Sequence, residues 1–188
     1  MRPKLSHIAL FSAAIVLLGG AYFDASAHKG ATGIVKDRMH VMKGMGDNMK
    51  LLKKMFDGEV PYDAAKAQAA AASIEKHGGK ALTKMFPKGS MQKPTEATPK
   101  IWENWPGFEA NAMRLQAYAG ALKHSLAQPA NAIQPAAAAG DMTDSGAEGV
   151  DWPAAANLQD QPPQIALNYV AKTCKSCHEG YRIKKKDD

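Results

Sequence analysis

Apolar residues recur at steps of three and four along two stretches of the chain, a spacing that places them on one side of an α-helix. In the first stretch they are Val35, Met39, Met42, Gly46, Met49, Leu52 and Phe56. In the second they are Ile101, Trp105, Phe108, Ala112, Leu115, Ala119, Leu122 and Leu126. Each stretch therefore predicts an amphipathic helix that buries one face.

Two more helices are predicted between and after these stretches. Residues 62–86 are rich in alanine and are bounded by Pro61 and Pro87, and Gly78-Gly79 predicts a kink within them. The last helix is predicted from Pro163 to Lys184. Its inner side consists of Ala166, Val170, Cys174, Cys177 and Tyr181. No run has the alternation of a strand, so the pattern predicts an all-α protein folded as an antiparallel four-helix bundle.

Residues 128–163 interrupt this pattern. They contain the alanine run 136–139, several Gly and Pro residues and no sustained period, which predicts a long, flexible connection between the third and fourth helices. Trp152-Pro153 is the exception, because an aromatic side chain gains free energy when it docks on a helix bundle.

The first 27 residues have the three parts of a secretory signal peptide. Arg2 and Lys4 form a positive region, residues 8–18 form a short apolar region, and Ala25-Ser26-Ala27 forms a cleavage site before His28. A membrane anchor is the alternative, but the apolar run is shorter than the ~20 residues that span a bilayer. We therefore expect export of a single domain, residues 28–188, that is not held in a membrane.

The excess of basic over acidic residues indicates which kind of partner this protein would bind. The chain has 24 Lys and Arg against 18 Asp and Glu, and removal of Arg2, Lys4 and Asp24 with the signal peptide leaves 22 against 17. A basic balance suits docking to an acidic protein surface. A nucleic-acid partner is not predicted, because no helix has a concentrated basic face with interleaved aromatic residues.

The segment Cys174-Lys175-Ser176-Cys177-His178 has the Cys-x-x-Cys-His spacing of covalent haem attachment. The two thiols form thioethers with one haem, and His178 binds its iron. A thioredoxin-like dithiol is disfavoured because the surrounding pattern is helical. A zinc site is disfavoured because no second cluster of ligands appears. The segment therefore predicts one covalent haem c with its iron.

Several motifs resemble those of the class II c-type cytochromes, the cytochrome c′ and cytochrome c-556 proteins. They are Arg38-x-x-x-Met42-Lys43, Tyr62-Asp63-Ala64-Ala65, Phe86-Pro87-x-Gly89-Ser90, Ile101-Trp102-Glu103-x-x-x-x-Phe108 and Cys174-x-x-Cys177-His178-x-x-Tyr181-Arg182. The resemblance implies an up-down-up-down bundle, a periplasmic location and His178 as the proximal iron ligand. Many members of this family form homodimers through their first two helices, and the sequence leaves open whether this chain forms a homodimer too.

The resemblance makes Met42 the residue that decides the state of the iron. A Met at this position coordinates the second face of the haem iron in the c-556 type, whereas in the c′ type an apolar side chain leaves that face open to small gases. We expect Met42 to be the distal ligand. Core packing of Met42 and ligation by His40 are the alternatives.

Three further residues are predicted to act on the haem. In the family, the Arg at the position of Arg38 binds a haem propionate, usually with a Gln after it, and this chain has Met39 in place of that Gln. Tyr181 and Arg182 follow His178 by about one turn, where they can shape its environment.

These observations lead to two functional hypotheses. The first is a periplasmic carrier of single electrons with a His/Met-ligated haem, and the alternative is a five-coordinate binding protein for nitric oxide or other small gases. No enzyme activity is predicted, because no catalytic triad, carboxylate pair or phosphate loop stands out. Lys172, Lys175, Arg182 and the run Lys184–Lys186 predict a basic rim for an acidic redox partner.

Overall fold

The structure, a computed structural model, describes residues 30–128 and 151–183. The predicted signal peptide, residues 129–150 of the predicted connection and the lysines at 184–186 lie outside the described residues. Seven helices occur within the two described ranges: α1 (Gly33–Phe56), α2 (Ala64–His77), α3 (Gly79–Thr83), α4 (Lys100–Glu103), α5 (Trp105–Ala127), α6 (Ala156–Gln159) and α7 (Pro163–Tyr181).

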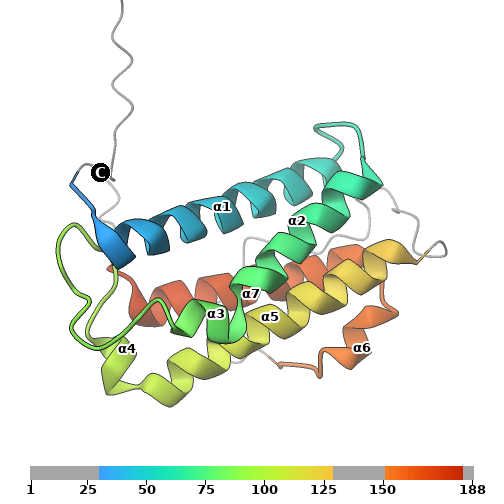
Figure 1. Ribbon diagram of the computed structural model, residues 1–188. Coiled ribbons are helices and arrows are strands. Elements are labelled where there is room, and N and C mark those ends of the chain that lie inside the picture. The colour runs from blue at the N-terminus through green and yellow to red at the C-terminus, as the bar shows by residue number, and fades with distance from the viewer. Residues whose placement is uncertain (1–29, 129–150, 184–188) are drawn as a thin grey trace, which may run out of the picture.

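The long helices run in alternating directions and form an up-down-up-down bundle (Figure 1). Helix α5 is central, since it packs against both α2 and α7, while α1 packs mainly on α2. Over the described ranges there is no strand, and only an isolated bridge joins Ala97 and Arg182. The all-α bundle predicted from the hydrophobic pattern is therefore confirmed. No helix in the described part is long and apolar enough to cross a membrane.

Helix α1 buries a stripe that differs in part from the predicted one. Arg38 and Met45 are buried in it, whereas Gly46, which the sequence placed on the stripe, is exposed. The prediction was wrong at Gly46 because only apolar residues were assigned to the stripe. For the same reason Met39 was assigned to it and the charged Arg38 was not. The buried residues Val35, Arg38 and Met45 follow one another at steps of three and seven positions, which keeps them on one side of the helix, and one of them has a charged side chain.

The second predicted helix is divided at its two glycines, as the sequence predicted. Asp63 caps the start of α2 by accepting a hydrogen bond from Lys66 N at 3.0 Å. Helix α2 ends at His77, and the next residue, Gly78, lies so close to α5 that an added Cβ would be 2.9 Å from the Cα of Gln116. The bend thus lets α3 continue along α5.

The third predicted helix is also divided, which the sequence did not predict. The chain leaves helical geometry at Asn104 (φ −129°, ψ 60°), between α4 and α5. Pro106 explains the break, because a proline has no N–H for the carbonyl of the preceding turn but fits the first turn of a new helix. The Asn104 side chain caps α5 by accepting a hydrogen bond from Gly107 N at 3.2 Å.

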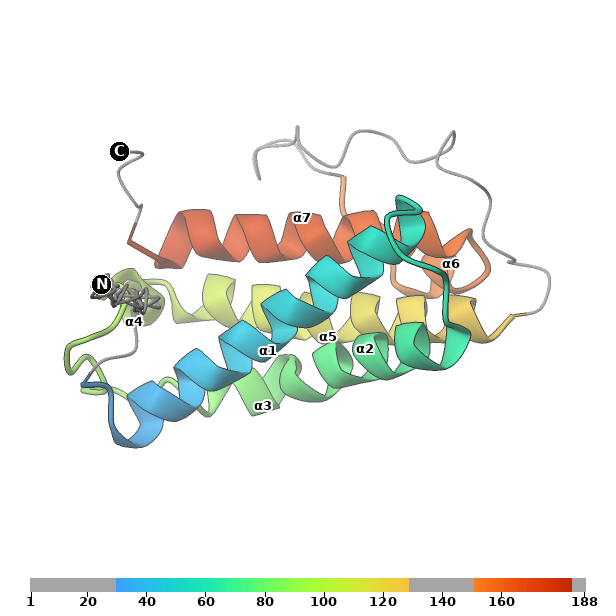
Figure 2. The same ribbon diagram turned by 90° about the horizontal axis from the view of Figure 1, so that it is seen from above.

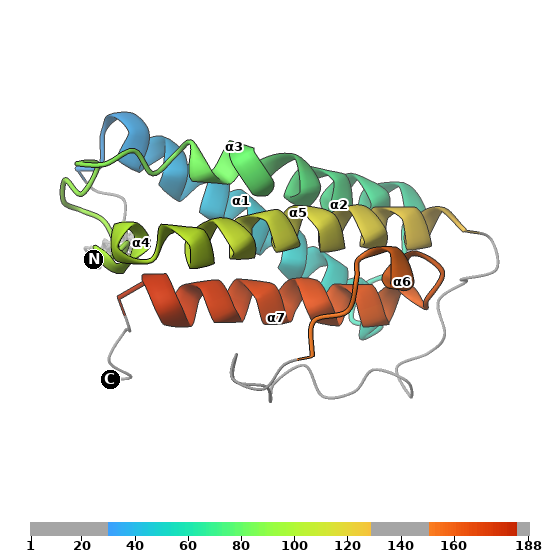
Figure 3. The ribbon, with the colours of Figure 1, turned by 90° about the horizontal axis from the view of Figure 1, so that it is seen from below.

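The segment before α7 docks on α5 (Figure 3). Trp152 stacks on Tyr118 with ring centroids 6.2 Å apart and lies 4.1 Å from the guanidinium carbon of Arg114. The Tyr118 hydroxyl donates to Pro153 O at 2.8 Å. The docking predicted for Trp152 is therefore confirmed. Residues 156–159 form α6, a short helix that the sequence pattern did not predict.

Three segments that are distant in sequence meet at one end of the bundle. They are the start of α1, the loop of residues 84–99 and the end of α7 (Figure 2). In the same view α1 runs obliquely to α7, and the start of α1 lies well to the side of α7. The residues predicted to hold a haem come from these segments.

Candidate haem site

Helix α7 presents the attachment residues on one face. Cys177 and His178 follow Cys174 by three and four positions, which places both of them next to Cys174 on the helix surface. All three are half-buried, and the two cysteines pack on the edge of the hydrophobic core. The helix therefore brings together the three residues that the sequence predicted for covalent attachment and proximal ligation.

Shielding from water sets the protonation of this face. Burial raises the pKa of the Cys174 thiol to about 11 and that of Cys177 to about 12, and Cys174 adds to the rise at Cys177. Burial lowers the pKa of His178, with a smaller lowering from Arg182 that Glu96 opposes. The thiols are thus neutral and unlike the activated thiolates of redox dithiols. The imidazole is neutral, which is the form that binds a metal.

The loop before α4 holds the end of α7 in place. The backbone N and the Oγ1 of Thr98 both donate to Tyr181 O, at 3.0 and 3.1 Å. Ile183 N donates to Glu96 O at 2.7 Å. These bonds end α7 at Tyr181, three residues before the predicted end, because Arg182 is extended and pairs with the loop.

The side chains of Tyr181 and Arg182 have partners within the protein. The Tyr181 ring packs edge-on against Phe108 with centroids 5.4 Å apart, and its hydroxyl accepts a hydrogen bond from Asn104 Nδ2 at 3.2 Å. Arg182 Nε lies 3.9 Å from a Glu96 carboxylate oxygen. These contacts tie the end of α7 to the loop and to α5. Direct contact of either side chain with a haem stays a prediction.

Helix α1 supplies the candidate distal residues. Met42 is half-buried and packs on the hydrophobic core, one turn after the buried Arg38. His40, the alternative ligand, is exposed. Met42 and Arg38 thus lie on the inner side of α1 at the end of the bundle where α7 carries its cysteines.

Arg38 is buried, and no counter-ion for it occurs among the described residues. Only 4% of its surface is exposed, Nη2 donates to Ser90 O at 2.8 Å, and the guanidinium carbon lies 4.5 Å from the Phe86 ring centroid. Nη1 has no hydrogen-bond partner, and no carboxylate in the described ranges pairs with the side chain. Burial lowers the pKa of Arg38. A buried guanidinium with a free donor is a site for an anion.

These residues fit haem c. Cys174, Cys177 and His178 match the vinyl groups and the iron, the thioether of Met42 is a second soft ligand, and the free donor of Arg38 suits a propionate. Sequence reasoning gave no role to Phe86 or Ser90, although both stand in a turn motif. In the described part of the chain, no group of three or more His, Cys, Asp or Glu residues is arranged to hold a metal ion by itself.

A separate cavity of about 400 Å³ lies between α4, α5 and α7. It is lined by Lys100, Glu103, Asn104, Asn111, Ser176, Gly180 and Tyr181. Ser176 and Gly180 are each two positions from His178, so they point to a different side of α7. This polar cavity is therefore not the predicted haem face.

Comparison with known proteins gives consistent matches. A family model described as Cytochrome C′ matches residues 33–148, which include α1 to α5 and end before the haem motif. Cytochrome c-556 of Agrobacterium fabrum strain C58 is 32% identical over 155 residues, which cover 82% of this chain and 84% of that protein. Cytochrome c′ of Rhodopseudomonas palustris is 29% identical over 174 residues, which cover 92% and 94% of the two chains.

A solved structure shows a similar bundle. The structure of cytochrome c′ from Rhodopseudomonas palustris matches with a TM-score of 0.59 and 27% sequence identity. The match covers 83% of this chain and all of the other one (100%).

Proposed function

The chain belongs to the cytochrome c′ family, whose members carry a covalently bound haem c with iron, and on this basis we propose that it is a periplasmic carrier of single electrons. When bound, haem c supplies a one-electron iron couple. The protein binds and orients this group and tunes its potential. No substrate and no catalytic residue form part of the proposal.

Helix α7 is proposed to hold the haem. Cys174 and Cys177 would each hold it through a thioether, and His178 would bind its iron. Because the imidazole belongs to the same rigid helix as both thioethers, its position is fixed by the backbone. The bonds from Thr98 to Tyr181 O keep the end of this helix from fraying.

The position of Met42 is the observation that favours electron transfer over gas binding. Its side chain turns to the core rather than to solvent, and it lies one turn beyond Arg38 at the end of the bundle that holds the haem motif. A thioether ligand raises the reduction potential of a haem. It also occupies the position that a gas would need. We therefore propose that His178 and Met42 would be the two protein ligands of the iron.

The binding of nitric oxide or other small gases is the second candidate function. Relatives named cytochrome c-556 and relatives named cytochrome c′ match this chain at similar identity. Half-buried Met42 also fits a purely packing role, since a flexible Met fills irregular gaps. In that case the distal face is open to a small ligand.

Optical spectra of the purified protein separate the two functions. With Met42 as ligand, the wild type is low-spin in both oxidation states and binds carbon monoxide slowly. Met42→Ala should then become high-spin, have a lower reduction potential and bind carbon monoxide faster, while the haem stays attached.

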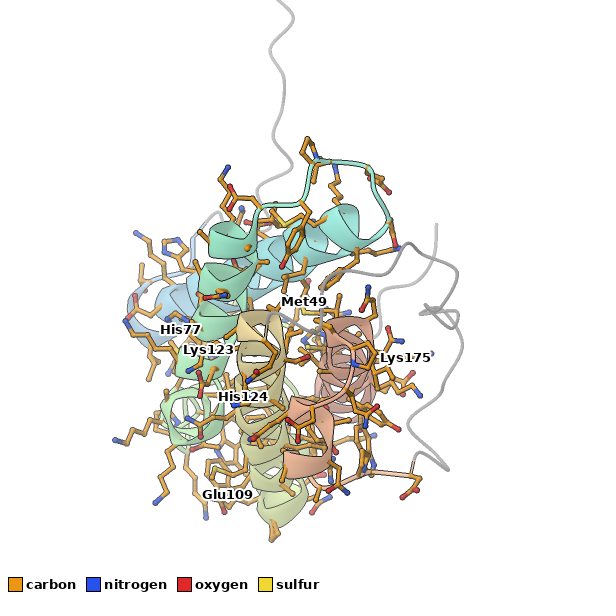
Figure 4. All side chains as sticks on the ribbon, turned by 90° about the vertical axis from the view of Figure 1, so that its right-hand side faces the viewer. Met49, His77, Glu109, Lys123, His124 and Lys175 are labelled. Atoms are coloured by element: carbon orange, nitrogen blue, oxygen red, sulfur yellow. The ribbon has the colours of Figure 1, made fainter. Side chains whose placement is uncertain are left out.

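Met49→Ala is the matched control, because Met49 is also half-buried against the core on α1, two turns further on (Figure 4). It should keep the low-spin spectrum. A wild type that is already high-spin and is unchanged by Met42→Ala would exclude ligation and support the gas-binding function.

A further inference from the structure

Two buried hydrogen-bond donors lie together without partners at the haem end of the bundle. They are Nη1 of Arg38 and Oγ of Ser90, in side chains that are 4% and 5% exposed. Neither atom has a hydrogen-bond partner within the described ranges. The two residues are joined, because Arg38 Nη2 donates to Ser90 O at 2.8 Å. Buried polar groups in native proteins are nearly always satisfied, so this pair points to a missing acceptor.

A tight turn holds Ser90 beside the guanidinium. Ser90 N donates to Pro87 O at 3.2 Å, and Gly89 has a φ of +84°, as the third residue of a type II turn requires. Phe86, just before the turn, lies under the Arg38 guanidinium, and its carbonyl accepts a hydrogen bond from Trp102 Nε1 at 3.0 Å. The position of Ser90 is therefore set by the fold rather than by a free loop.

The chemistry of the pair selects its acceptor. A guanidinium and a hydroxyl are both donors, and a carboxylate accepts from two donors at once. Arg38 has no carboxylate partner in the described part of the chain. Met39, the next residue along α1, is apolar and offers no side-chain donor. The second donor beside Arg38 is therefore Ser90 Oγ, which the loop provides.

We propose that Ser90 Oγ and Arg38 Nη1 donate to the same haem propionate, with Ser90 as the second anchor of that carboxylate. This inference rests on the proposed haem site and goes beyond it, since it names a residue outside both haem-binding helices. Ser90 binds the propionate and does not touch the iron. The two donors draw negative charge away from the haem, which favours the ferrous state.

Removal of the hydroxyl tests this role. Ser90→Ala should lower the reduction potential and shift the propionate bending band in the resonance Raman spectrum. Ser90→Thr keeps an Oγ and should restore both. In D₂O the wild-type band should shift through exchange of the donated protons, and Ser90→Ala should show a smaller shift.

Ser125→Ala is the matched control, because Ser125 is a fully buried serine at the opposite end of α5 whose hydroxyl donates to Gln161 O. It should destabilise the fold without changing the potential or the Raman band. A double-mutant cycle with Arg38→Met tests whether the donors share one acceptor. Shared binding predicts that the effect of Ser90→Ala on the potential differs between the two backgrounds.

The outcomes separate this inference from the proposed function. If Ser90→Ala carries haem but keeps the wild-type potential and Raman band, Ser90 is only structural and the inference is wrong, while electron transfer by a His/Met haem stands. The same holds if the cycle shows simple additivity. A protein without covalent haem would overturn both proposals.

Discussion

At the scale of single residues, one face of α7 holds two thiols and an imidazole that are partly shielded from water. Cys174, Cys177 and His178 are half-buried, and burial keeps both thiols protonated and the imidazole neutral near pH 7. A neutral imidazole is ready to bind iron. Thiols that stay protonated resist oxidation to a disulfide until they are attached.

Attachment gives the first prediction. Mass spectrometry of the exported protein should show a chain that begins near His28 and is heavier by one haem that survives acid extraction. Cys174→Ala combined with Cys177→Ala should abolish this added mass, because no other cysteine is present in the chain. Met42→Ala serves as the control and should keep it. Purification of the mature wild type with zinc or without a cofactor would contradict the prediction.

The type of residue explains why the buried positions of α1 were predicted only in part. Hydropathy favoured Met39 and Gly46 for the buried stripe, but the structure buries Arg38 and Met45 there. The cause is chemical: the buried Arg38 guanidinium donates to Ser90 O and lies over the Phe86 ring, and a hydrophobic period does not reveal such contacts. Cys174, Cys177 and His178 were predictable because their spacing alone defines their chemistry.

At the scale of elements, the bend between α2 and α3 depends on close approach to α5. Gly78→Ala should destabilise the protein by about 1–3 kcal/mol, since the new Cβ would stand 2.9 Å from the backbone of Gln116 and force the helices apart. Urea denaturation measures this change in the free energy of unfolding.

Gly44→Ala on α1 is the matched control for this prediction. Gly44 is exposed within a helix and has nothing within 4 Å of an added Cβ. The substitution should stabilise the protein by about 0.5–1 kcal/mol, because alanine loses less backbone entropy than glycine. Equal effects of the two substitutions would show that the contact with Gln116 is unimportant.

Element boundaries show a second limit of the sequence. The long apolar stripes predicted that α1, α5 and α7 exist, because a helical period that continues over many turns is not compatible with a strand or a loop. The break at Asn104 was missed since the apolar stripe continues through it and only Pro106 marks it. Helix α6 was missed because four residues are too few to establish a period.

The segment before α7 gives a prediction about the aromatic contact on α5. Trp152→Ala should lower the free energy of unfolding by about 1–2 kcal/mol, since it removes both the stack on Tyr118 and the cation–π contact with Arg114. Arg114→Ala should cost less, and the double variant should cost less than the two single effects added. Strict additivity in urea denaturation would mean that the two side chains do not interact.

At the scale of the whole molecule, the haem end of the bundle is closed by contacts between distant parts of the chain. Thr98 bonds to Tyr181 across 83 positions, and Arg38 bonds to Ser90 across 52. A helical period carries no information about such contacts, because they depend on how a loop folds back. The family resemblance predicted the bundle and its topology, but the role of the loop became clear only from the structure.

The charges around this end predict how the protein meets its partner. Lys175 is exposed and projects from α7 away from the other helices, whereas the Lys172 ammonium lies 5.2 Å from the Tyr169 ring centroid (Figure 4). We therefore expect Lys175 to contribute more to the steering of an acidic partner.

Lys175→Glu should lower the rate of electron transfer to an acidic partner at low ionic strength, and the difference from wild type should shrink as salt rises. The reason is that the Debye length falls to about 8 Å at physiological ionic strength. Lys54→Glu makes the same change of charge at the opposite end of α1, where Lys54 is exposed, and should leave the rate nearly unchanged. Stopped-flow kinetics at several salt concentrations measures both variants. If the two substitutions slow the reaction equally, the effect comes from net charge and the partner does not dock at the haem end.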